Sequence, residues 1–290
     1  MISIVKLLVL AGSFIGSLVA STVLSIASEP LFPQSPGMVS YTYRIEFAKD
    51  FEGTLDTVRS LGITDMEFSN LFGKTANEIR AMLDMRGMKC SSFGVSYSDL
   101  RNKTYEVAAN AKILGATFVR VAWIPDRQPF TLELAEQTTR EFNEIGRLLR
   151  KEFNLTFCYH NHGYEFVAHG DGTLFDVLMA QTNPEDVYIE LDILWAKFPG
   201  ADPVAIIDKY GNRIKLMHLK DLKKGIEGNL SGTTAIENDV ALGTGQLDIP
   251  AILVAAKKAG VEHYYIEDES PNIETQVPQS IAYLKSLQTH

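Results

Sequence analysis

Histidines and carboxylates recur where the last four β-rich segments of this chain end. The first of these ends, residues 158–165, is Cys-Tyr-His-Asn-His-Gly-Tyr-Glu, and the next three lie at residues 190–192, 217–221 and 265–269. Side chains alternate between the two faces of a strand, so each end can direct one ligand toward a common point. The predicted metal ligands are His160, Asp192, His218 and Glu267. Two imidazoles and two carboxylates suit one divalent ion, Zn, Mn or Fe(II), better than Mg or Ca, which prefer oxygen-only shells.

Three further side chains near strand ends are candidates for substrate binding. Glu67 ends an earlier β-rich segment and is predicted to contact a substrate. Trp123 and Trp195 can stack on the face of a sugar, although tryptophan more often serves in packing. These three predictions depend on position alone.

Some of the same residue types have structural explanations. Glu190 would lie about 7 Å deeper in a barrel than the residue two positions later. It is therefore expected to be a structural charge paired with a basic group such as Arg120. For His160 and His162, a hydrogen-bonded place in the pocket wall is the alternative to metal or proton chemistry.

The elements that must hold these residues alternate between β-rich and helix-period segments. The predicted strands are residues 39–44, 64–69, 89–95, 118–123, 156–160, 187–193, 215–218 and 264–267. The predicted helices are residues 54–61, 77–86, 105–114, 132–152, 174–180, 203–209, 249–259 and 278–287. Eight strand–helix units predict an α/β protein, a (β/α)8 TIM barrel, as a single domain over residues 38–290. A doubly wound open sheet, the main alternative, would carry a glycine-rich phosphate loop after its first strand, and residues 41–46 contain no glycine.

The first 27 residues are predicted to be a secretory signal peptide. A lysine at position 6 precedes an uncharged apolar run that ends in Ser25-Ile26-Ala27, with small residues at the two positions that signal peptidase recognises. A retained membrane anchor and a buried helix are the alternatives, because the run is about long enough to span a bilayer. Residues 28–37 contain three prolines and are interpreted as a linker. A secreted or periplasmic location is expected.

Composition and charge narrow the class of protein. The chain has 290 residues, of which 46% are hydrophobic and 22% charged, an ordinary globular composition. Its formal net charge of -9 argues against a nucleic-acid binder, which would carry a basic stripe. Cys90 and Cys158 fall in non-adjacent predicted strands and are expected to be buried free thiols. The long connection over residues 223–245 is expected to be a functional lid or a mobile segment.

From about Val39 to its C-terminus, the chain resembles the sugar phosphate isomerase/epimerase family, also called xylose isomerase-like barrels. The most specific motifs are residues 159–162 (Tyr-His-Asn-His), 190–192 (Glu-Leu-Asp), 218–221 (His-Leu-Lys-Asp) and 243–248 (Gly-Thr-Gly-Gln-Leu-Asp). The resemblance implies one divalent metal ion held by Glu, Asp, His and Glu. The last three correspond to Asp192, His218 and Glu267, whereas His160 stands where many relatives carry the first Glu. His162 corresponds to a residue that binds substrate or transfers protons.

The histidine at position 160 affects the expected mechanism. The resemblance implies two metal-bound glutamates, one on each face of a sugar, that remove and return a proton beside a carbonyl through a metal-stabilised enediolate. Of that pair only Glu267 is present. The second proton must then come from His162, Glu165 or Lys220, unless the reaction uses one base. Lys220 is also placed, by its spacing from His218, to stabilise a developing oxyanion.

The leading prediction is a metal-dependent isomerase or epimerase acting on a small carbohydrate. An unphosphorylated sugar or keto-sugar is favoured, because no cluster of Arg and Lys marks a phosphate site. The first alternative is a dehydratase, or a lyase that acts on a keto-sugar, polyol or keto-glycoside by β-elimination. A non-catalytic sugar-binding protein and a DNA-repair endonuclease of the related barrel type are the others. Homo-oligomer formation is left open.

Overall fold

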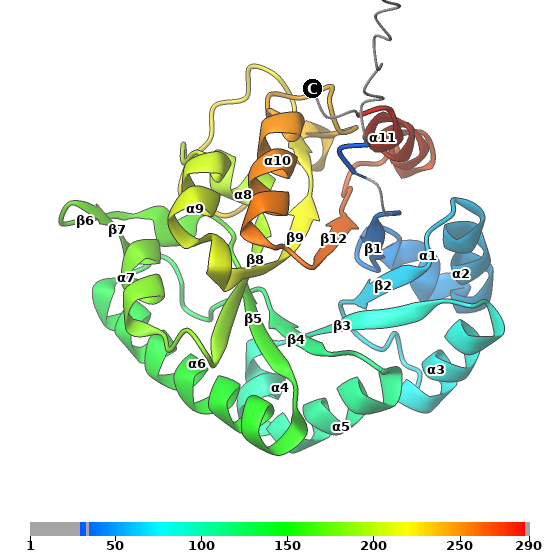
Figure 1. Cartoon of the computed structure of the whole chain (residues 1–290), viewed down its shortest axis with the longest axis horizontal. Coiled ribbons are helices and arrows are strands. Elements are labelled where there is room, and N and C mark those ends of the chain that lie inside the picture. Colours follow the sequence, from blue (N-terminus) through cyan, green and yellow to red (C-terminus); the bar gives the residue numbers. More distant parts are fainter. Residues whose placement is uncertain (1–29, 33–34, 288–290) are drawn as a thin grey trace, which may run out of the picture.

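Eight parallel strands close into a barrel in the computed structural model, which describes residues 30–32 and 35–287 (Figure 1). The strands are β1 (Gly37–Val39), β2 (Asp65–Phe68), β3 (Lys89–Val95), β4 (Phe118–Val121), β5 (Thr156–His160), β8 (Val187–Asp192), β9 (Ile214–Leu219) and β12 (His263–Ile266). They pair in chain order, and β1 closes the ring against β12. The predicted (β/α)8 TIM barrel is confirmed. The predicted signal peptide, residues 1–27, lies outside the described residues.

Helices surround the barrel (Figure 1). They are α1 (Arg44–Lys49), α2 (Phe51–Ser60), α3 (Ala76–Met85), α4 (Tyr97–Asn102), α5 (Thr104–Leu114), α6 (Leu132–Phe153), α7 (Leu174–Gln181), α8 (Ile193–Lys197), α9 (Pro203–Tyr210), α10 (Ile249–Ala259) and α11 (Ile273–Ser286). Their boundaries follow local chemistry, as α10 illustrates. Asp248 accepts a hydrogen bond from Ala251 N at 3.1 Å, Pro250 lies in the first turn, and Gly260 ends the helix with φ 80°.

An apolar layer inside the barrel supports its polar upper end. Val39, Phe118, Cys158, Leu216 and Tyr265 form one buried cluster contributed by five different strands. Three of these residues lie two positions before a predicted ligand, and therefore about 7 Å deeper on the same face of the strand. The larger apolar core is a second buried cluster. Both cysteines are buried and free, as predicted.

The N-terminal part of the barrel differs from the prediction. Strand β1 covers Gly37–Val39, and the β-prone residues 41–43 instead form a turn into α1. This turn is closed by a hydrogen bond from Thr42 N to Val39 O at 3.1 Å. Helices α1, α4 and α8 are too short to show a helical period and are not predicted. Helix α11 begins five residues before the predicted proline start, and Pro278 lies inside it.

Residues 30–32 and 35–37 do not form the free linker that the prolines suggest. Leu31 and Phe32 are buried, and the Phe32 ring lies edge-on to Tyr264 at 5.2 Å between centroids. Leu31 N donates to Leu287 O at 3.0 Å, and Gly37 already belongs to β1. Burying a large apolar side chain is worth about 1.5–3 kcal/mol. The two apolar residues between the prolines thus bind this segment to the barrel.

The long connection over residues 223–245 has a fixed base. A short antiparallel hairpin pairs β10 (Asp221–Leu222) with β11 (Asp239–Val240). The Asp221 carboxylate accepts backbone N–H groups of Leu222, Gly243, Gly245 and Leu247 at 2.9–3.1 Å. A Cβ at position 245 would lie 2.2 Å from Asp221 Oδ1, so only glycine fits there. These contacts explain the Gly-Thr-Gly-Gln-Leu-Asp motif.

The remaining elements are short. They are a hairpin of β6 (Ala168–His169) and β7 (Gly172–Thr173) and the 3-10 turns η1 (Tyr164–Phe166), η2 (Gly211–Arg213) and η3 (Ile236–Asn238). In the described part of the chain, no helix has both the length and the apolar character needed to cross a membrane.

Candidate active site

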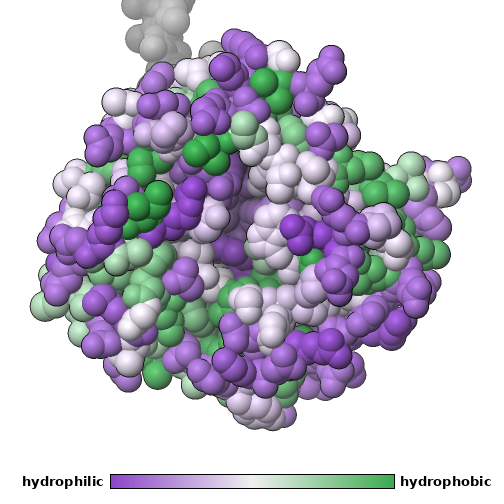
Figure 2. Space-filling view, turned by 180° about the vertical axis from the view of Figure 1, so that it is seen from behind, coloured by the Kyte–Doolittle hydropathy of each residue, from purple (hydrophilic) through white to green (hydrophobic). Residues whose placement is uncertain are grey.

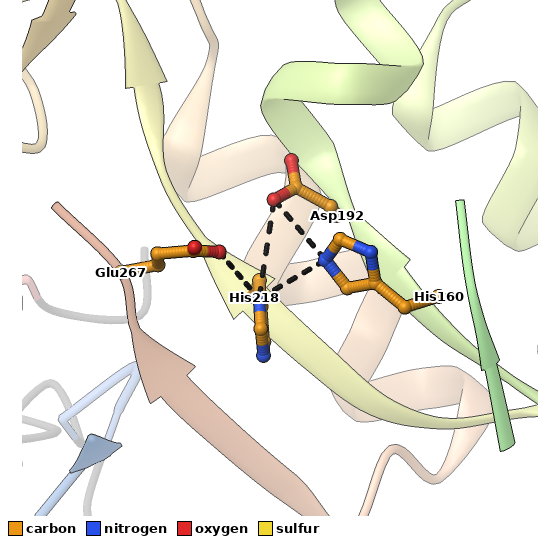
Figure 3. A group of neighbouring side chains, drawn as sticks. All are labelled: His160, Asp192, His218 and Glu267. Carbon is orange, nitrogen blue, oxygen red and sulfur yellow. Dashed lines mark hydrogen bonds and ion pairs between the residues drawn. The ribbon is translucent and has the colours of Figure 1, made fainter. Parts of the chain in front are cut away.

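Four side chains converge at the carboxyl end of the barrel strands (Figure 3). They are the predicted ligands His160, Asp192, His218 and Glu267, and one donor atom of each lies within 4.8 Å of the others. His218 Nδ1 is 2.7 Å from Glu267 Oε2 and 3.1 Å from His160 Nε2. His160 Nε2 is in turn 3.5 Å from Asp192 Oδ2. Donors that bind one ion at roughly 2.0–2.2 Å lie at such separations from each other.

The donor set fits a divalent metal ion. Asp192 Oδ2 is buried and has no hydrogen-bond partner among the described residues, an expensive state for an oxygen atom unless a cation binds it. Burial, aided by the charge of His218, holds the pKa of His160 well below its usual value, so this ring is neutral and able to ligate. Burial alone would raise the pKa of Glu267, but Lys220 and His218 outweigh it and hold that pKa well below its usual value. The site therefore offers a neutral imidazole and a carboxylate.

Asp192 is held in place by a helix and by Asn161. Its Oδ1 accepts the N–H of Trp195 at 2.8 Å and so caps α8, which leaves Oδ2 for a cation. Asn161 Oδ1 accepts from Asp192 N at 3.0 Å, and Asn161 Nδ2 donates to Asp192 O at 3.2 Å. Asn161 is completely buried. Sequence reasoning does not find this function, and the only indication is the position of Asn161 between two site histidines.

A buried ion-pair network lies beneath His218. Its Nε2 is 3.0 Å from Glu67 Oε1 and 3.3 Å from Glu190 Oε2. Arg120 Nε lies 3.1 Å from the same Glu67 oxygen and 3.0 Å from Glu190 Oε2. These carboxylates fix the orientation of the imidazole and direct Nδ1 toward the other three ligands. The predicted pairing of Glu190 with Arg120 is confirmed. Burial and the charge of Glu67 raise the pKa of Glu190 to about 7.

Glu67 belongs to this network and does not fit the predicted contact with a substrate. It is completely buried, does not line the cavity, and accepts a hydrogen bond from Ser92 Oγ at 2.5 Å. Although burial opposes it, the charges of Arg120 and His218 hold the pKa of Glu67 well below its usual value. The sequence shows that Glu67 lies near the end of a strand, but not how deep in the barrel its side chain lies.

His162 lines the cavity beside the ligand cluster. Its Nδ1 is 3.1 Å from Ala122 O, which can accept a hydrogen bond from this nitrogen, and in that tautomer Nε2 is able to take up a proton. The same Nδ1 is 3.3 Å from His160 Nδ1, so the protonation states of the two rings are linked. Burial and the neighbouring His160 hold the pKa of His162 well below its usual value. The ring is therefore a neutral acid–base group.

Glu165 does not face the cavity, so its predicted part in proton transfer is not available. It is completely buried and accepts hydrogen bonds from His162 N at 3.0 Å and Gly163 N at 2.7 Å. The hydroxyl of Tyr159 donates to it as well. Burial raises its pKa. Glu165 thus shapes the turn that carries His162.

Lys220 is a fixed cation in the cavity wall. Its Nζ contacts Glu269 and lies 3.5 Å from Asp239 Oδ2 and 3.7 Å from Glu267 Oε1. Burial alone would lower its pKa, but these carboxylates raise it well above the usual value. A lysine that stays protonated cannot act as a base. It can stabilise negative charge or donate a proton.

A cavity of about 660 Å³ is lined by His160, His162, His218, Lys220 and Glu267, among others. A hollow opens at the centre of the face shown in Figure 2, and its floor is mainly hydrophilic. Trp195 is buried in the cavity wall, and its ring centre lies 5.6 Å from Lys220 Nζ, whereas Trp123 is 38% exposed. The connection 223–245 supplies one wall through residues 232–236. A Cβ at Gly232 would lie 3.0 Å from His162 O, so this wall packs directly against the turn that carries His162.

A closed (β/α)8 barrel with a histidine–carboxylate cluster at its carboxyl end defines the class of protein. Residues 55–287 match the family model of the xylose isomerase-like TIM barrel, and this chain belongs to that family. The match covers more than half of the chain and includes all four clustered ligands.

Curated relatives with sequence similarity are named inosose dehydratase. The protein from Clostridium tetani is 26% identical over 197 residues, which cover 61% of this chain and 65% of that protein. The protein from Lacticaseibacillus casei is 26% identical over 247 residues, which cover 74% of this chain and 80% of that protein. The chain thus spans slightly less than two thirds of the first relative.

Solved structures share the fold at lower identity. A sugar phosphate isomerase/epimerase from Parabacteroides distasonis has a TM-score of 0.70 and 21% identity, and the match covers 93% of this chain and 98% of that one. The IolI protein with a bound zinc atom has a TM-score of 0.64 and 14% identity, and the match covers 87% and 95% of the two chains.

Proposed function

We propose that this protein is a metal-dependent lyase that removes water from a keto-polyol or keto-sugar. The observation that carries the proposal is His162, an unligated base in the cavity beside a cluster that has only Glu267 of the expected pair of glutamates. One base suffices for elimination, whereas epimerisation by the expected route needs a carboxylate on each face. The relatives named inosose dehydratase support the same choice. The dehydratase alternative therefore fits better than the leading isomerase prediction.

The four clustered residues would hold the metal ion, and the cavity residues would move the protons. The chemistry that a bound divalent ion supplies is Lewis-acid polarisation of a carbonyl oxygen. His162 takes the proton from the carbon beside that carbonyl while Ala122 O holds its Nδ1–H. Lys220 stabilises the negative charge that develops, and the proton that His162 has taken is then delivered to the departing hydroxyl group. The C–H and C–O bonds that break account for one water, and no oxidant is required.

A direct test uses protein stripped with a chelator and resupplied with Mn, Zn or Mg. Incubation with inosose in deuterated water should give a product that has lost one water, seen by mass spectrometry and by the absorbance of a conjugated ketone. Turnover should depend on the added ion. A product that has lost no water, with or without deuterium at the carbon beside the carbonyl, would instead show isomerisation or epimerisation, and would refute the proposal.

Two variants assign the residues. His162→Gln should abolish turnover while the protein still binds the metal ion, because His162 is not one of the clustered ligands. His218→Ala should lose both turnover and metal binding. His169→Gln is the matched control, since His169 is an exposed histidine of the hairpin β6–β7 and should leave both unchanged. Metal retention in His218→Ala would show that the assigned site is wrong.

We also propose that the reaction takes place outside the cytoplasm. The apolar run and the Ser-Ile-Ala sequence at positions 25–27 support cleavage and export. The mass of the protein recovered from a periplasmic or medium fraction tests this, and an intact N-terminus would contradict cleavage.

A further inference from the structure

Arg127 is stacked at the outer side of the cavity, next to the proposed base. Its guanidinium carbon lies 3.8 Å from the centre of the Trp123 ring, and the His162 ring lies 3.9 Å from the same centre. Two groups that close to one ring centre cannot share a face, so Trp123 is enclosed between His162 and Arg127. The indole therefore offers no free face to a sugar, contrary to the stacking expected from the sequence.

Arg127 is also a cation of the cavity wall, and no carboxylate among the described residues is paired with it. Arg120 is paired with Glu67 and Glu190, and Lys220 is surrounded by three carboxylates. Among residues 30–32 and 35–287, by contrast, Arg127 forms no ion pair, and its Nε is buried without a hydrogen-bond partner. Stacking on Trp123 holds the guanidinium plane in a fixed position without using its hydrogen-bond donors.

We propose that Arg127 binds a carboxylate group of the substrate, so that the substrate is a keto-sugar acid or a similar carboxylated keto-polyol. This inference rests on the proposed function for the reacting end of the substrate. A guanidinium group matches a planar carboxylate through two parallel hydrogen bonds. A single arginine suits a monoanion, whereas a phosphate group would call for a cluster of basic residues.

The geometry places both ends of such a molecule within reach. The two stacking distances allow at most 7.7 Å between the Arg127 guanidinium carbon and the centre of the His162 ring. One sugar ring that carries a carboxylate can therefore touch both groups. The carboxylate would orient the ring so that one defined C–H bond faces His162, which gives Arg127 a role in specificity.

Equilibrium binding tests the inference without turnover. Calorimetry would compare D-glucuronate with D-glucose, which differ in the carboxylate, on the metal-loaded protein. The variants are Arg127→Met, which keeps a side chain able to pack on Trp123, and Arg127→Lys, which keeps the charge. Arg140→Met is the matched control, because Arg140 is exposed on α6 and its loss changes the net charge equally.

We expect wild type and Arg140→Met to bind glucuronate about ten-fold or more tightly than glucose, as a charge-assisted hydrogen bond implies. Arg127→Met should bind the two sugars equally, with glucose affinity unchanged, and Arg127→Lys should retain part of the preference. A wild type without the preference, or an Arg127→Met variant that keeps it, would overturn the inference. If Arg127→Met binds both sugars more weakly by the same factor, Arg127 only supports the stack with Trp123, and the inference is wrong. Glucose 6-phosphate is a third ligand for the wild type, and tighter binding of it than of glucuronate would overturn the carboxylate assignment. A preference for glucuronate without any elimination of water would refute only the proposed function.

Discussion

Replacing Asn161 by alanine should damage the metal site although Asn161 is not a predicted ligand. The substitution leaves the N–H and the C=O of Asp192 without their partners at 3.0 and 3.2 Å in a completely buried place. Each unpaired buried group costs about 1–3 kcal/mol, so the free energy of unfolding should fall by about 2–6 kcal/mol. Asp192 also loses its fixed position, and the loss of such outer support typically lowers metal affinity 10–100-fold.

Two measurements follow both effects. Urea unfolding of the metal-free protein gives the loss of stability, and competition with a chromophoric chelator gives the metal affinity. Asn143→Ala is the matched control, because Asn143 makes the same kind of paired contact, with Gln181 O at 3.0 Å and Asn183 N at 2.6 Å, but on the surface. The control should lose about 1 kcal/mol or less and keep its affinity. Wild-type metal affinity in Asn161→Ala would refute the reasoning.

Three other outcomes are expected. Hydrogen bonds from three neighbours outweigh burial and lower the pKa of Asp176 from 3.8 to about 2. At pH values above the unfolded pKa this carboxylate therefore stabilises the fold, by about 1 kcal/mol once solvent screening of the partly exposed group is allowed for, and the contribution is lost as pH falls through about 2. Asp176→Asn should thus be less stable at neutral pH and lose less on acidification, and an unchanged acid transition would contradict this. Gly232→Ala should reduce turnover because its Cβ would press on His162 O. Gly225→Ala is the control, because position 225 has a similar positive φ but open space around it, and its turnover should not change. Equal effects of the two substitutions would contradict a role for residues 232–236 in the reaction. A divalent ion in thousand-fold excess over its Kd should stabilise the wild type by about 4 kcal/mol in thermal unfolding and leave His218→Ala unaffected.

The grouping of the four ligands could be predicted from the sequence because strand periodicity is local. His160, Asp192, His218 and Glu267 each stand at the end of a strand, and the barrel brings such ends together. The depth of a side chain along the barrel axis, by contrast, depends on contacts with other strands and does not follow from the local sequence. Glu67 therefore looked like a cavity residue, although contacts with Arg120 on another strand hold it beneath the site.

The direction of a side chain in a turn and the contacts between distant segments could not be predicted either. Glu165 follows a histidine motif in the sequence, but its carboxylate turns back to the N–H groups of His162 and Gly163. The two hydrogen bonds between Asn161 and Asp192 depend on the pairing of β5 with β8 in the sheet. The burial of Leu31 and Phe32 was not predicted, because composition shows the three prolines of residues 28–37 but not the contacts that these two side chains make with the barrel.

The hairpin of β10 and β11 has a consequence for how this scaffold can diversify. It brings Leu222 opposite Asp239, and Asp221 fixes the turn that follows, so the intervening residues start and finish at one place. Lengthening a loop whose ends are already joined costs little conformational entropy. The metal-binding side chains come from other strands, and the segment touches the turn that carries His162 at Gly232. The segment between β10 and β11 can therefore be replaced by one of another length that changes the substrate range, provided that the glycine packed against His162 is kept.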